Sequence, residues 1–406
     1  MKFFVGAKFS DKKLILSDTL KRKIYLINNI DLSFYNKDSL LYSKELKKIF
    51  QINNKIIFSE KCYEDRIIDF YKFYNSVRNS KQMNLTLDFG EDCNLNCKYC
   101  YEDKNIPYDK NLNISLLYDF IVKYVSQNEI SNIHFELYGG EPLLYKDLIV
   151  NFLHKMKESK LSYDFSIMTN GTLYDKEFYQ YLIENGLKKV EISLDGPEHI
   201  HEKMRPMKSG QNGYTLIVSN LQKLVEITSV VVRVNVGKYN ISYLKKLMND
   251  LEKFDLKKKI FIYFTPIIHP SLQLDFNKPC YELGNLYEYA LKQGFCIPMR
   301  LYSSGPCYLQ KNHSYAVLSD NAICKCIAIK NTRVENTELF DKSGCKSQIK
   351  ISSECERCDL LPICFGGCQY KDTECSKLVF ESILPGFLRG KGEYYGKTEK
   401  NGYYIC

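Results

Sequence analysis

Three cysteines stand close together in one short stretch of the chain, at Cys93, Cys97 and Cys100. Their spacing, C-x3-C-x2-C, places three thiols in a single loop, whereas a tetrahedral zinc ion or a standard iron–sulfur cubane takes four protein ligands. Three ligands suit a [4Fe–4S] cluster in which one iron stays open for another molecule. The spacing alone leaves two alternatives open: a zinc site with a distant fourth ligand, or a chance grouping in a cysteine-rich chain.

Glycines and polar residues follow short β-rich runs in the next part of the chain. The runs begin at Met83, Phe135, Phe165, Val190, Val230 and Ile260, and helix-length stretches at 117–126, 176–185 and 216–226 lie between them. Strands that alternate with helices predict a parallel sheet, and polar groups at their carboxyl ends predict a site at that edge. These groups are Gly139-Gly140-Glu141, Thr169-Asn170-Gly171, Ser193-x-Asp195 and the later Arg205. Each alone could instead be a helix cap or a surface turn.

Together these motifs resemble the signature of the radical S-adenosylmethionine (SAM) enzymes, over roughly residues 83–375. In that family the open iron chelates the amino and carboxylate groups of SAM, and an electron from the cluster releases a 5′-deoxyadenosyl radical that abstracts hydrogen. The resemblance implies an α/β fold with a partial (β/α)6 TIM-like barrel. It also implies that a set of residues contacts SAM, namely Gly139, Gly140, Glu141, Asn170, Ser193, Asp195 and Arg205.

The composition is that of a soluble globular protein of two or three domains, with 406 residues of which 45% are hydrophobic. The N-terminus lacks an apolar signal region and no long apolar run occurs, which predicts a cytoplasmic protein without a membrane partner. Sixteen cysteines in such a chain indicate metal or cluster ligation. The net charge of +9 is spread over the surface and could favour an acidic peptide, and no motif indicates nucleic-acid binding.

A second group of cysteines follows the predicted barrel. Its members are Cys307, Cys326 and the run Cys355-x2-Cys358-x5-Cys364-x3-Cys368-x6-Cys375. This pattern resembles the SPASM domain, an appendage of radical SAM enzymes that act on peptides and proteins. Asn321 replaces the usual glycine of the earlier half, and asparagine tolerates the left-handed conformation of such a turn. A pair of zinc ribbons is the alternative.

The SPASM resemblance implies two auxiliary [4Fe–4S] clusters. The outer cluster would be held by Cys355, Cys358, Cys364 and Cys375, and the inner cluster by Cys307, Cys326 and Cys368. The family often supplies a fourth inner ligand a few residues before the first cysteine, where this chain has Leu301. The replacement is Cys280, Cys296 or Cys324, or one iron is open and could bind a substrate thiolate.

The motifs divide the chain into three predicted domains: an N-terminal segment over 1–82, the barrel over 83–295 and the SPASM domain over 296–406. In the N-terminal segment, 2–9 and 13–16 read as strands, and 43–50 and 63–77 read as helices. Such a small α+β segment could bind the leader of a precursor peptide, as winged-helix domains of peptide maturases do, or could only pack against the barrel. A helix over 281–293 is expected to end at Gly294.

These resemblances imply a radical SAM oxidoreductase that modifies a ribosomally made, Cys-containing precursor peptide, as in bacteriocin maturation, by forming thioethers. Its partners would be the precursor with its leader and a flavodoxin- or ferredoxin-type electron donor. The first alternative is a formylglycine-generating enzyme of the anaerobic sulfatase-maturing type. Those enzymes carry a catalytic Asp directly after the second SPASM cysteine, where this chain has Ile327. Further alternatives are a peptide cyclase that joins two carbons and a non-catalytic iron–sulfur electron carrier or zinc scaffold.

Overall fold

The computed structural model describes residues 3–21, 23–28, 30–52, 63–100, 112–267, 269–298, 306–307, 310–327, 351–367 and 375–396. The chain divides into two compact units that interleave along the sequence. The first comprises Met1–Arg78, Gln273–Cys307 and Ile349–Cys406, and the second comprises Asn79–Leu272 and Tyr308–Gln348. The domain boundaries expected at residues 82 and 295 were placed from sequence motifs, whereas these two units are defined by contacts between residues. The boundaries therefore remain predictions.

The second unit is built on an eight-stranded sheet with the order β10-β9-β8-β7-β6-β5-β11-β12. Six parallel strands form most of it: β5 (Gln82–Asp88), β6 (Asn132–Tyr138), β7 (Tyr163–Thr169), β8 (Leu187–Ser193), β9 (Ser229–Val236) and β10 (Ile260–Pro266). The helices between them are α3 (Ile114–Asn128), α4 (Lys146–Glu158), α5 (Lys176–Glu184), α6 (Glu198–Met204), α7 (Gly213–Leu224) and α8 (Leu244–Lys253). The six strands expected from the sequence, and their alternation with helices, are confirmed.

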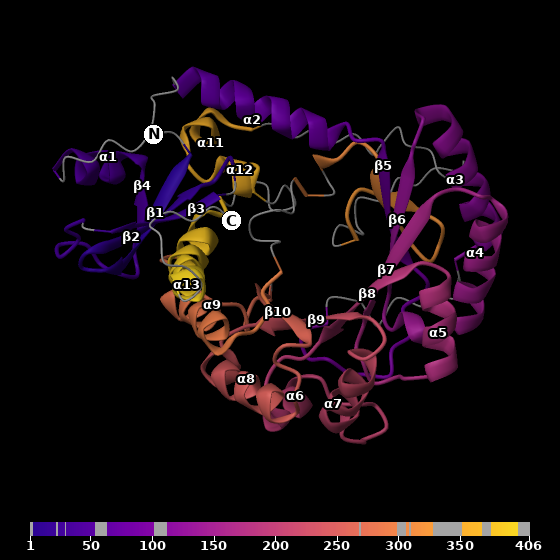
Figure 1. Cartoon of the computed structure of the whole chain (residues 1–406). Coiled ribbons are helices and arrows are strands. Elements are labelled where there is room, and N and C mark those ends of the chain that lie inside the picture. The colour runs from indigo at the N-terminus through magenta and orange to yellow at the C-terminus, as the bar shows by residue number, and fades with distance from the viewer. Residues whose placement is uncertain are drawn as a thin grey trace. The chain divides into compact units, whose positions relative to one another are not determined.

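The alternation of buried and half-buried residues shows which face of this sheet meets the helices. On β6, Ile133, Phe135 and Leu137 are buried and the residues between them are half-buried. The Phe135 ring meets that of Phe152 on α4 edge to face, with 4.9 Å between the centroids. In Figure 1, helices α3 to α8 follow one face of the sheet. Because side chains alternate along a strand, the even-numbered residues of β6 face the inside of the partial barrel.

Two strands from later in the chain extend the sheet, and the sequence did not predict them. β11 (Ser314–Val317) pairs in parallel with β5, and β12 (Ile323–Cys324) pairs antiparallel with β11. Between β5 and β11 the Asn84 side-chain amide donates a hydrogen bond to the Ser314 hydroxyl (3.1 Å). The turn before β12 holds Asn321 at φ 70°, so the expected left-handed asparagine is confirmed.

The first unit contains a small antiparallel sheet with the order β3-β2-β1-β4. Its strands are β1 (Phe4–Ser10), β2 (Lys13–Asp18), β3 (Lys23–Asn28) and β4 (Leu40–Tyr42), followed by α1 (Ser43–Ile52) and α2 (Tyr63–Arg78). The other helices that the structure describes in this unit are α9 (Tyr281–Gln293), α11 (Ser353–Arg357), α12 (Leu361–Cys364) and α13 (Lys377–Gly396). The strands and helices expected from the sequence are therefore present, whereas β3, β4, α11, α12 and α13 were not expected.

Residues from both ends of the chain form one hydrophobic core in the first unit. Phe70 of α2 packs with Phe365, which follows α12, and their ring centroids are 6.1 Å apart. The carboxylate of Asp359 accepts hydrogen bonds from the backbone N–H groups of Phe3 and Ser43, each at 2.9 Å. The N-terminal segment is thus built into the same unit as the cysteines of α11 and α12.

Helices α9 and α13 of the first unit cross at very close range. A Cβ atom on Gly386 of α13 would collide with the backbone of Gly284 on α9, and one on Gly284 would collide with the carbonyl of Ser382. Only glycine permits backbones to approach so closely. Helix α9 ends at Gly294 with φ 89°, so the expected C-cap is confirmed.

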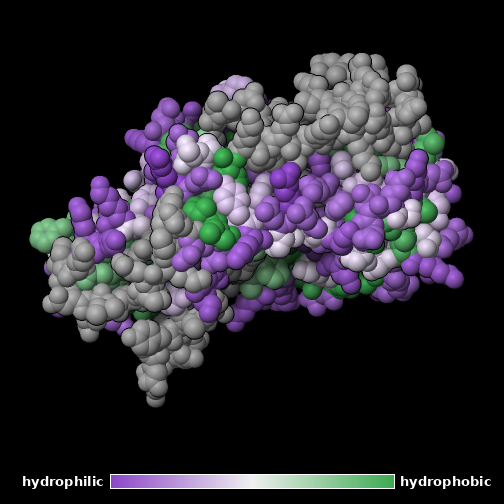
Figure 2. Space-filling model, turned by 90° about the horizontal axis from the view of Figure 1, so that it is seen from above, coloured by the Kyte–Doolittle hydropathy of each residue, from purple (hydrophilic) through white to green (hydrophobic). Residues whose placement is uncertain are grey.

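The described surface is mostly hydrophilic on the face shown in Figure 2, where hydrophobic residues form small scattered patches. Among the described residues, no helix is both long enough and apolar enough to span a membrane.

Candidate active site

The three-cysteine loop pairs with the segment that follows α6 in the second unit. Three backbone hydrogen bonds join them: Asn96 N–H to the Pro206 carbonyl (2.8 Å), Lys98 N–H to the Met204 carbonyl (2.9 Å), and Lys208 N–H to the Asn94 carbonyl (2.9 Å). The two segments are far apart in the sequence and run antiparallel. This pairing fixes the loop that carries Cys93 and Cys97 beside Arg205.

Glycines let the cysteine loop approach the turn after β6. The N–H of Gly140 donates to the carbonyl of Gly90 (2.9 Å), and the N–H of Glu141 donates to the carbonyl of Asp92 (2.8 Å). A Cβ atom on Gly140 would collide with the Asp92 carbonyl, and Gly139 has φ 134°. Both glycines are therefore required for contact between two protein segments. Their expected contact with SAM remains a prediction.

Glu141 is a fully buried carboxylate that ties the ends of β6 and β7 together. It accepts hydrogen bonds from the Thr169 hydroxyl (2.8 Å), the Asn170 N–H (2.8 Å) and the Leu143 N–H (3.1 Å). Burial raises the pKa of this carboxyl, and the three hydrogen bonds oppose that rise. Glu141 thus orders the strand ends around the cysteine loop, and a contact with the SAM ammonium remains a prediction.

Asn170 brings the end of β7 to the cysteine loop. Its side-chain NH2 donates to Asn94 Oδ1 (2.7 Å) and lies 3.8 Å from the sulfur of Cys93. The Asn94 amide in turn donates to the Thr172 hydroxyl (2.8 Å). Asn170 thus lies against the cysteine loop, and its expected contact with SAM remains a prediction.

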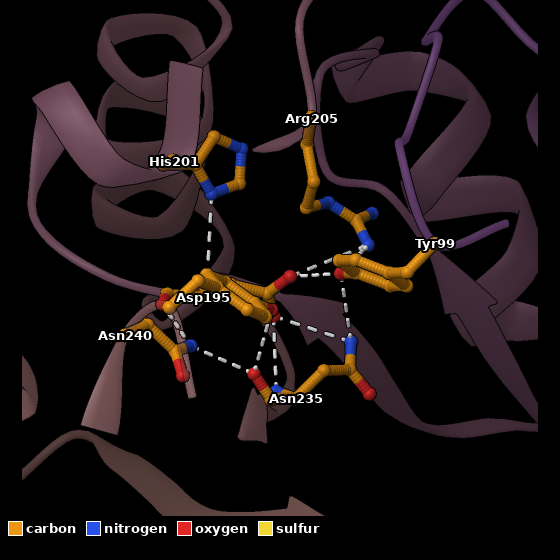
Figure 3. Close-up of polar contacts among 7 residues, drawn as sticks. Tyr99, Asp195, His201, Arg205, Asn235 and Asn240 are labelled. Atoms are coloured by element: carbon orange, nitrogen blue, oxygen red, sulfur yellow. Dashed lines mark hydrogen bonds and ion pairs between the residues drawn. The ribbon is translucent and has the colours of Figure 1, made fainter. Parts of the chain in front are cut away.

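Asp195, which follows β8, is the centre of a buried polar network (Figure 3). The Tyr99 hydroxyl, from between two cysteines, donates to one carboxylate oxygen. The Asn235 backbone N–H (2.9 Å) and side-chain amide (3.2 Å) donate to the other. Arg205 donates to the Tyr99 hydroxyl (2.9 Å), and its guanidinium lies 3.9 Å from Asp195. The network joins the cysteine loop to the ends of β8 and β9.

Two further side chains hold the backbone of Asp195. The Asn240 amide donates to the Asp195 carbonyl (2.6 Å), and the Asp195 N–H donates to Nδ1 of His201 (3.3 Å), as Figure 3 shows. Burial, reinforced by repulsion from Arg205, lowers the pKa of His201 well below its usual value, so the ring is neutral and can accept that bond. Ser193 ends β8 half-buried, and its contact with SAM remains a prediction.

Charge is concentrated around the cysteine loop. Burial raises the pKa of the Cys97 thiol, repulsion from Cys93 and Cys100 adds to that rise, and the Arg205 guanidinium opposes it. Burial by itself would lower the pKa of the Arg205 guanidinium. Attraction to Cys97 and Asp195 has a larger effect, so the pKa is raised. Three thiols that influence one another beside a buried cation suit an iron–sulfur cluster and the carboxylate of a bound cofactor. These residues therefore fit the expected SAM and cluster chemistry.

The four cysteines expected to hold the outer auxiliary cluster gather in the first unit. Burial raises the pKa of Cys364 to about 12, and charge repulsion from Cys375, Cys358 and Cys355 contributes to the rise. Across the described ranges, no three potential ligands stand close enough to hold one metal ion. This finding does not bear on a four-iron cluster, because its thiolates bind separate iron atoms.

The inner auxiliary set is only partly described. Cys307 lies in the first unit and Cys326 in the second, while Cys368 and Leu301 lie outside the described residues. Cys324 is buried against Ala316 and Leu318. The ligands of the inner cluster, including a fourth from Cys280, Cys296 or Cys324, therefore remain predictions.

Several residues of this site were not predicted from the sequence. They are Tyr99, Asn94, Asn235, Asn240 and Tyr239, whose ring stacks on that of Tyr99 with 6.1 Å between the centroids. Tyr99 could have been identified from the sequence, because it lies between two cysteines of the motif. No pattern distinguished Asn235 and Asn240, since asparagine is common in turns near the end of a strand.

A parallel sheet with a three-cysteine loop and convergent polar groups at its carboxyl ends defines a class of enzymes that hold an iron–sulfur cluster beside an organic cofactor. Residues 87–251 match the profile of the radical SAM superfamily. The chain therefore contains a radical SAM domain and is a radical SAM enzyme, whose cofactors are SAM and [4Fe–4S] clusters.

Two similar proteins and one solved structure extend beyond that domain. The cysteine-type anaerobic sulfatase-maturating enzyme of Clostridium novyi (strain NT) is 26% identical over 327 residues, which cover 68% of this chain and 85% of that protein. The radical SAM cyclopropyl synthase TigE of Paramaledivibacter caminithermalis is 24% identical, covering 70% of this chain and 61% of TigE. The structure of native anSMEcpe with bound AdoMet and Kp18Cys peptide is 20% identical, with a TM-score of 0.60, and covers 78% of this chain and 99% of that one. The structural similarity supports the expected fold, a radical SAM barrel with a Cys-rich C-terminal region of SPASM type.

Proposed function

We propose that this enzyme matures a ribosomally made, Cys-containing precursor peptide by joining a cysteine sulfur to a carbon of another residue. Support for a peptide or protein substrate comes from the relatives, one of which matures a sulfatase and one of which binds a peptide. The bound cofactors supply a SAM-derived carbon radical that removes hydrogen from a substrate carbon. The residues of this chain hold the cysteine loop, orient the cofactor through Asp195 and Arg205, and exclude water around Glu141.

The observation that favours a crosslink over formylglycine formation is the environment of Ile327. Sulfatase-maturing enzymes are expected to have a catalytic Asp at this position. Here the Ile327 side chain packs on an apolar cluster formed by Ala316, Leu318 and Cys324. An alkyl group in an apolar cluster cannot accept a proton, so the base needed to form formylglycine is missing at this position.

Formylglycine formation is the second candidate, because the similarity to the sulfatase-maturating enzyme covers 85% of that protein. A carbon–carbon crosslink is the third, since TigE is a cyclopropyl synthase with comparable similarity. All three reactions use the same cofactors and differ in the fate of the substrate thiol.

Mass spectrometry separates these outcomes. A Cys-containing precursor peptide is first sought among the small reading frames beside the gene. The purified, cluster-replete enzyme is then incubated anaerobically with SAM, dithionite and this peptide, and the product is alkylated with iodoacetamide. A thioether product is lighter by two hydrogens per crosslink and has lost one alkylatable thiol each time; a peptide with Cys replaced by Ala is the control. Loss of hydrogens with every cysteine still alkylatable indicates a carbon–carbon bond. An aldehyde that reacts with a hydrazide indicates formylglycine.

Three accompanying proposals concern the enzyme in its cell. The N-terminal sheet β1–β4 with α1 is a candidate site for the precursor's leader, although the Asp359 contacts show that it also has a structural role in the first unit. A flavodoxin- or ferredoxin-type protein supplies the electron. The enzyme acts in the cytoplasm, where such donors and free thiols are maintained.

A further inference from the structure

Glu136 is an acidic residue on the inner face of β6. It is half-buried, whereas Phe135 and Leu137 on either side of it are buried on the face that meets the helices. Tyr138, two residues later, projects from the same face as Glu136, about 7 Å nearer the carboxyl end of the strand. The turn at Gly140, which contacts the cysteine loop, follows directly. Glu136 therefore faces the interior of the partial barrel below that loop.

The carboxylate of Glu136 has no hydrogen bond or ion pair with any residue that the structure describes. The other carboxylates on the inner face of β5 to β10 are already bound: Asp88 by the Gly90 N–H (3.1 Å), Asp164 by His134 (2.5 Å) and Glu191 by the Tyr263 hydroxyl (2.5 Å). Glu136 is thus the inner-face carboxylate that is left to contact another molecule.

The register of the sheet places Glu136 on the same layer as the apolar cluster that Ile327 packs against. Ala316 of that cluster pairs with Thr86 on β5, and Thr86 pairs with Glu136. Residues paired in this way project from the same face, and neighbouring strands lie about 4.8 Å apart, so the backbone of Glu136 is about 10 Å from that of Ala316. Glu136 therefore faces the same region as the position where sulfatase-maturing enzymes are expected to carry their catalytic Asp.

Thioether formation releases a proton as well as a hydrogen atom. A substrate carbon gives a hydrogen atom to the SAM-derived radical, and the substrate thiol gives up its proton as its sulfur bonds to that carbon. The electron left over passes to an auxiliary iron–sulfur cluster, so the product is lighter by two hydrogens. The thiolate is the reactive form of cysteine, and a carboxylate within hydrogen-bonding reach of the thiol can accept the proton.

We propose that Glu136 is the general base that accepts the proton of the substrate thiol. This inference rests on the proposed function, since it requires that the substrate cysteine forms a thioether. Ile327 cannot accept a proton, and Glu136 supplies a carboxylate to the same layer from β6. Because Glu136 is only half-buried, it can pass the proton on to water after the sulfur–carbon bond has formed.

The test uses the full-length, cluster-replete enzyme and the Cys-containing precursor peptide that it crosslinks. Glu136→Gln keeps the size of the side chain but removes the carboxylate, and Glu136→Asp keeps the carboxylate. Glu177→Gln is the matched control, because Glu177 lies at an exposed position of α5. Release of 5′-deoxyadenosine and loss of alkylatable thiols are measured in one reaction. Fluorescence anisotropy of a labelled precursor, without SAM, measures peptide affinity.

Glu136→Gln should lower the rate of crosslinking by about 100-fold or more, while peptide affinity and SAM cleavage stay close to those of the wild type. Glu136→Asp should retain part of the activity, and Glu177→Gln should match the wild type. A precursor with selenocysteine in place of the reacting cysteine provides a second measurement, because a selenol is already ionised at neutral pH and needs no base. The wild type and Glu136→Gln should crosslink this precursor at similar rates.

Crosslinking of the cysteine precursor by Glu136→Gln at the wild-type rate overturns the inference. A loss that accompanies weaker peptide binding, or that selenocysteine does not relieve, assigns Glu136 to substrate binding or to the fold and also overturns it. Both results leave thioether formation standing. A wild-type enzyme that cleaves SAM but leaves every precursor thiol alkylatable contradicts the proposed function, and the base then falls with it.

Discussion

Arg205 places a permanent positive charge in a site where it is only 7% exposed. Such a charge is costly to bury unless anions surround it, and here Asp195, Cys93 and Cys97 do so. With the cluster bound, the cysteines would act as thiolates and would add to the negative charge around the guanidinium. We propose that Arg205 in addition contacts an ionic group of SAM.

Arg205→Ala is expected to weaken SAM binding by about 1.5–3 kcal/mol without removing any cluster, because one charge-assisted contact is lost. SAM affinity is measured anaerobically by equilibrium dialysis, alongside iron content. Lys208→Ala is the control, since Lys208 lies in the same segment with its side chain exposed and contributes its backbone N–H to the pairing. Equal affinities in the two variants would restrict Arg205 to a structural role.

Glu141→Ala, which removes three hydrogen bonds at the strand ends, should also reduce SAM affinity.

Replacing Cys93, Cys97 and Cys100 together with Ala should abolish reductive SAM cleavage, because this set is the one expected to leave an iron open for SAM. Iron content should fall from ~12 to ~8 per chain if all three sites hold four-iron cubanes. The measurement is 5′-deoxyadenosine release after dithionite reduction, with iron determined on the same sample. Formation of 5′-deoxyadenosine by the triple variant would refute the assignment of the cysteine loop.

Helices α9 and α13 illustrate how single glycines decide the packing of whole elements. Alanine is normally favoured over glycine in a helix by about 1 kcal/mol. At Gly386, however, the added Cβ would collide with the backbone of Gly284, and a backbone cannot move aside as a flexible side chain can. The steric cost therefore exceeds the gain in helix propensity.

Gly386→Ala is expected to lower the free energy of unfolding of the first unit by about 1–3 kcal/mol, as overpacking does. Asn285→Ala, at an exposed position of α9, is the control and should change stability by less than about 0.5 kcal/mol. Urea unfolding followed by circular dichroism measures both variants. A Gly386→Ala protein as stable as the control would show that the two helices do not depend on this close approach.

Across the whole chain, the SAM site and the outer auxiliary cysteines fall in different compact units. The first unit contains Cys355, Cys358, Cys364 and Cys375, and the second contains the cysteine loop with its strand-end network. Each set is surrounded by contacts within its own unit. Loss of one cluster should therefore leave the other in place.

Replacing all four outer cysteines with Ala should remove about one-third of the iron while 5′-deoxyadenosine formation continues. Peptide modification should be lost, because the electron left over after bond formation could no longer leave through the outer cluster. The comparison of SAM cleavage with peptide product in one reaction provides the measurement. A variant that still forms the mature peptide at the wild-type rate would show that the outer cluster has no part in turnover.

Much of the fold and part of the site could be predicted from local patterns. The spacing of Cys93, Cys97 and Cys100, the alternation of strands with helices, and Gly294 as a C-cap depend on residues close together in the chain. The left-handed turn at Asn321 is likewise a property of a few neighbours. Patterns of this kind are visible in the sequence because backbone geometry and burial act at fixed short periods.

Only the tertiary structure showed which distant residues meet. β11 joins the sheet beside β5, the cysteine loop pairs with 204–208, and Tyr99 meets Asp195 and Asn235. It also showed that the glycines after β6 serve a backbone contact and that Lys189 and Arg233 share a wall with Glu191. Such contacts follow from strand order and register over the whole sheet, so no local stretch of sequence contains them. The sequence by itself determined the class of cofactor chemistry, and the tertiary structure decided which side chains surround it.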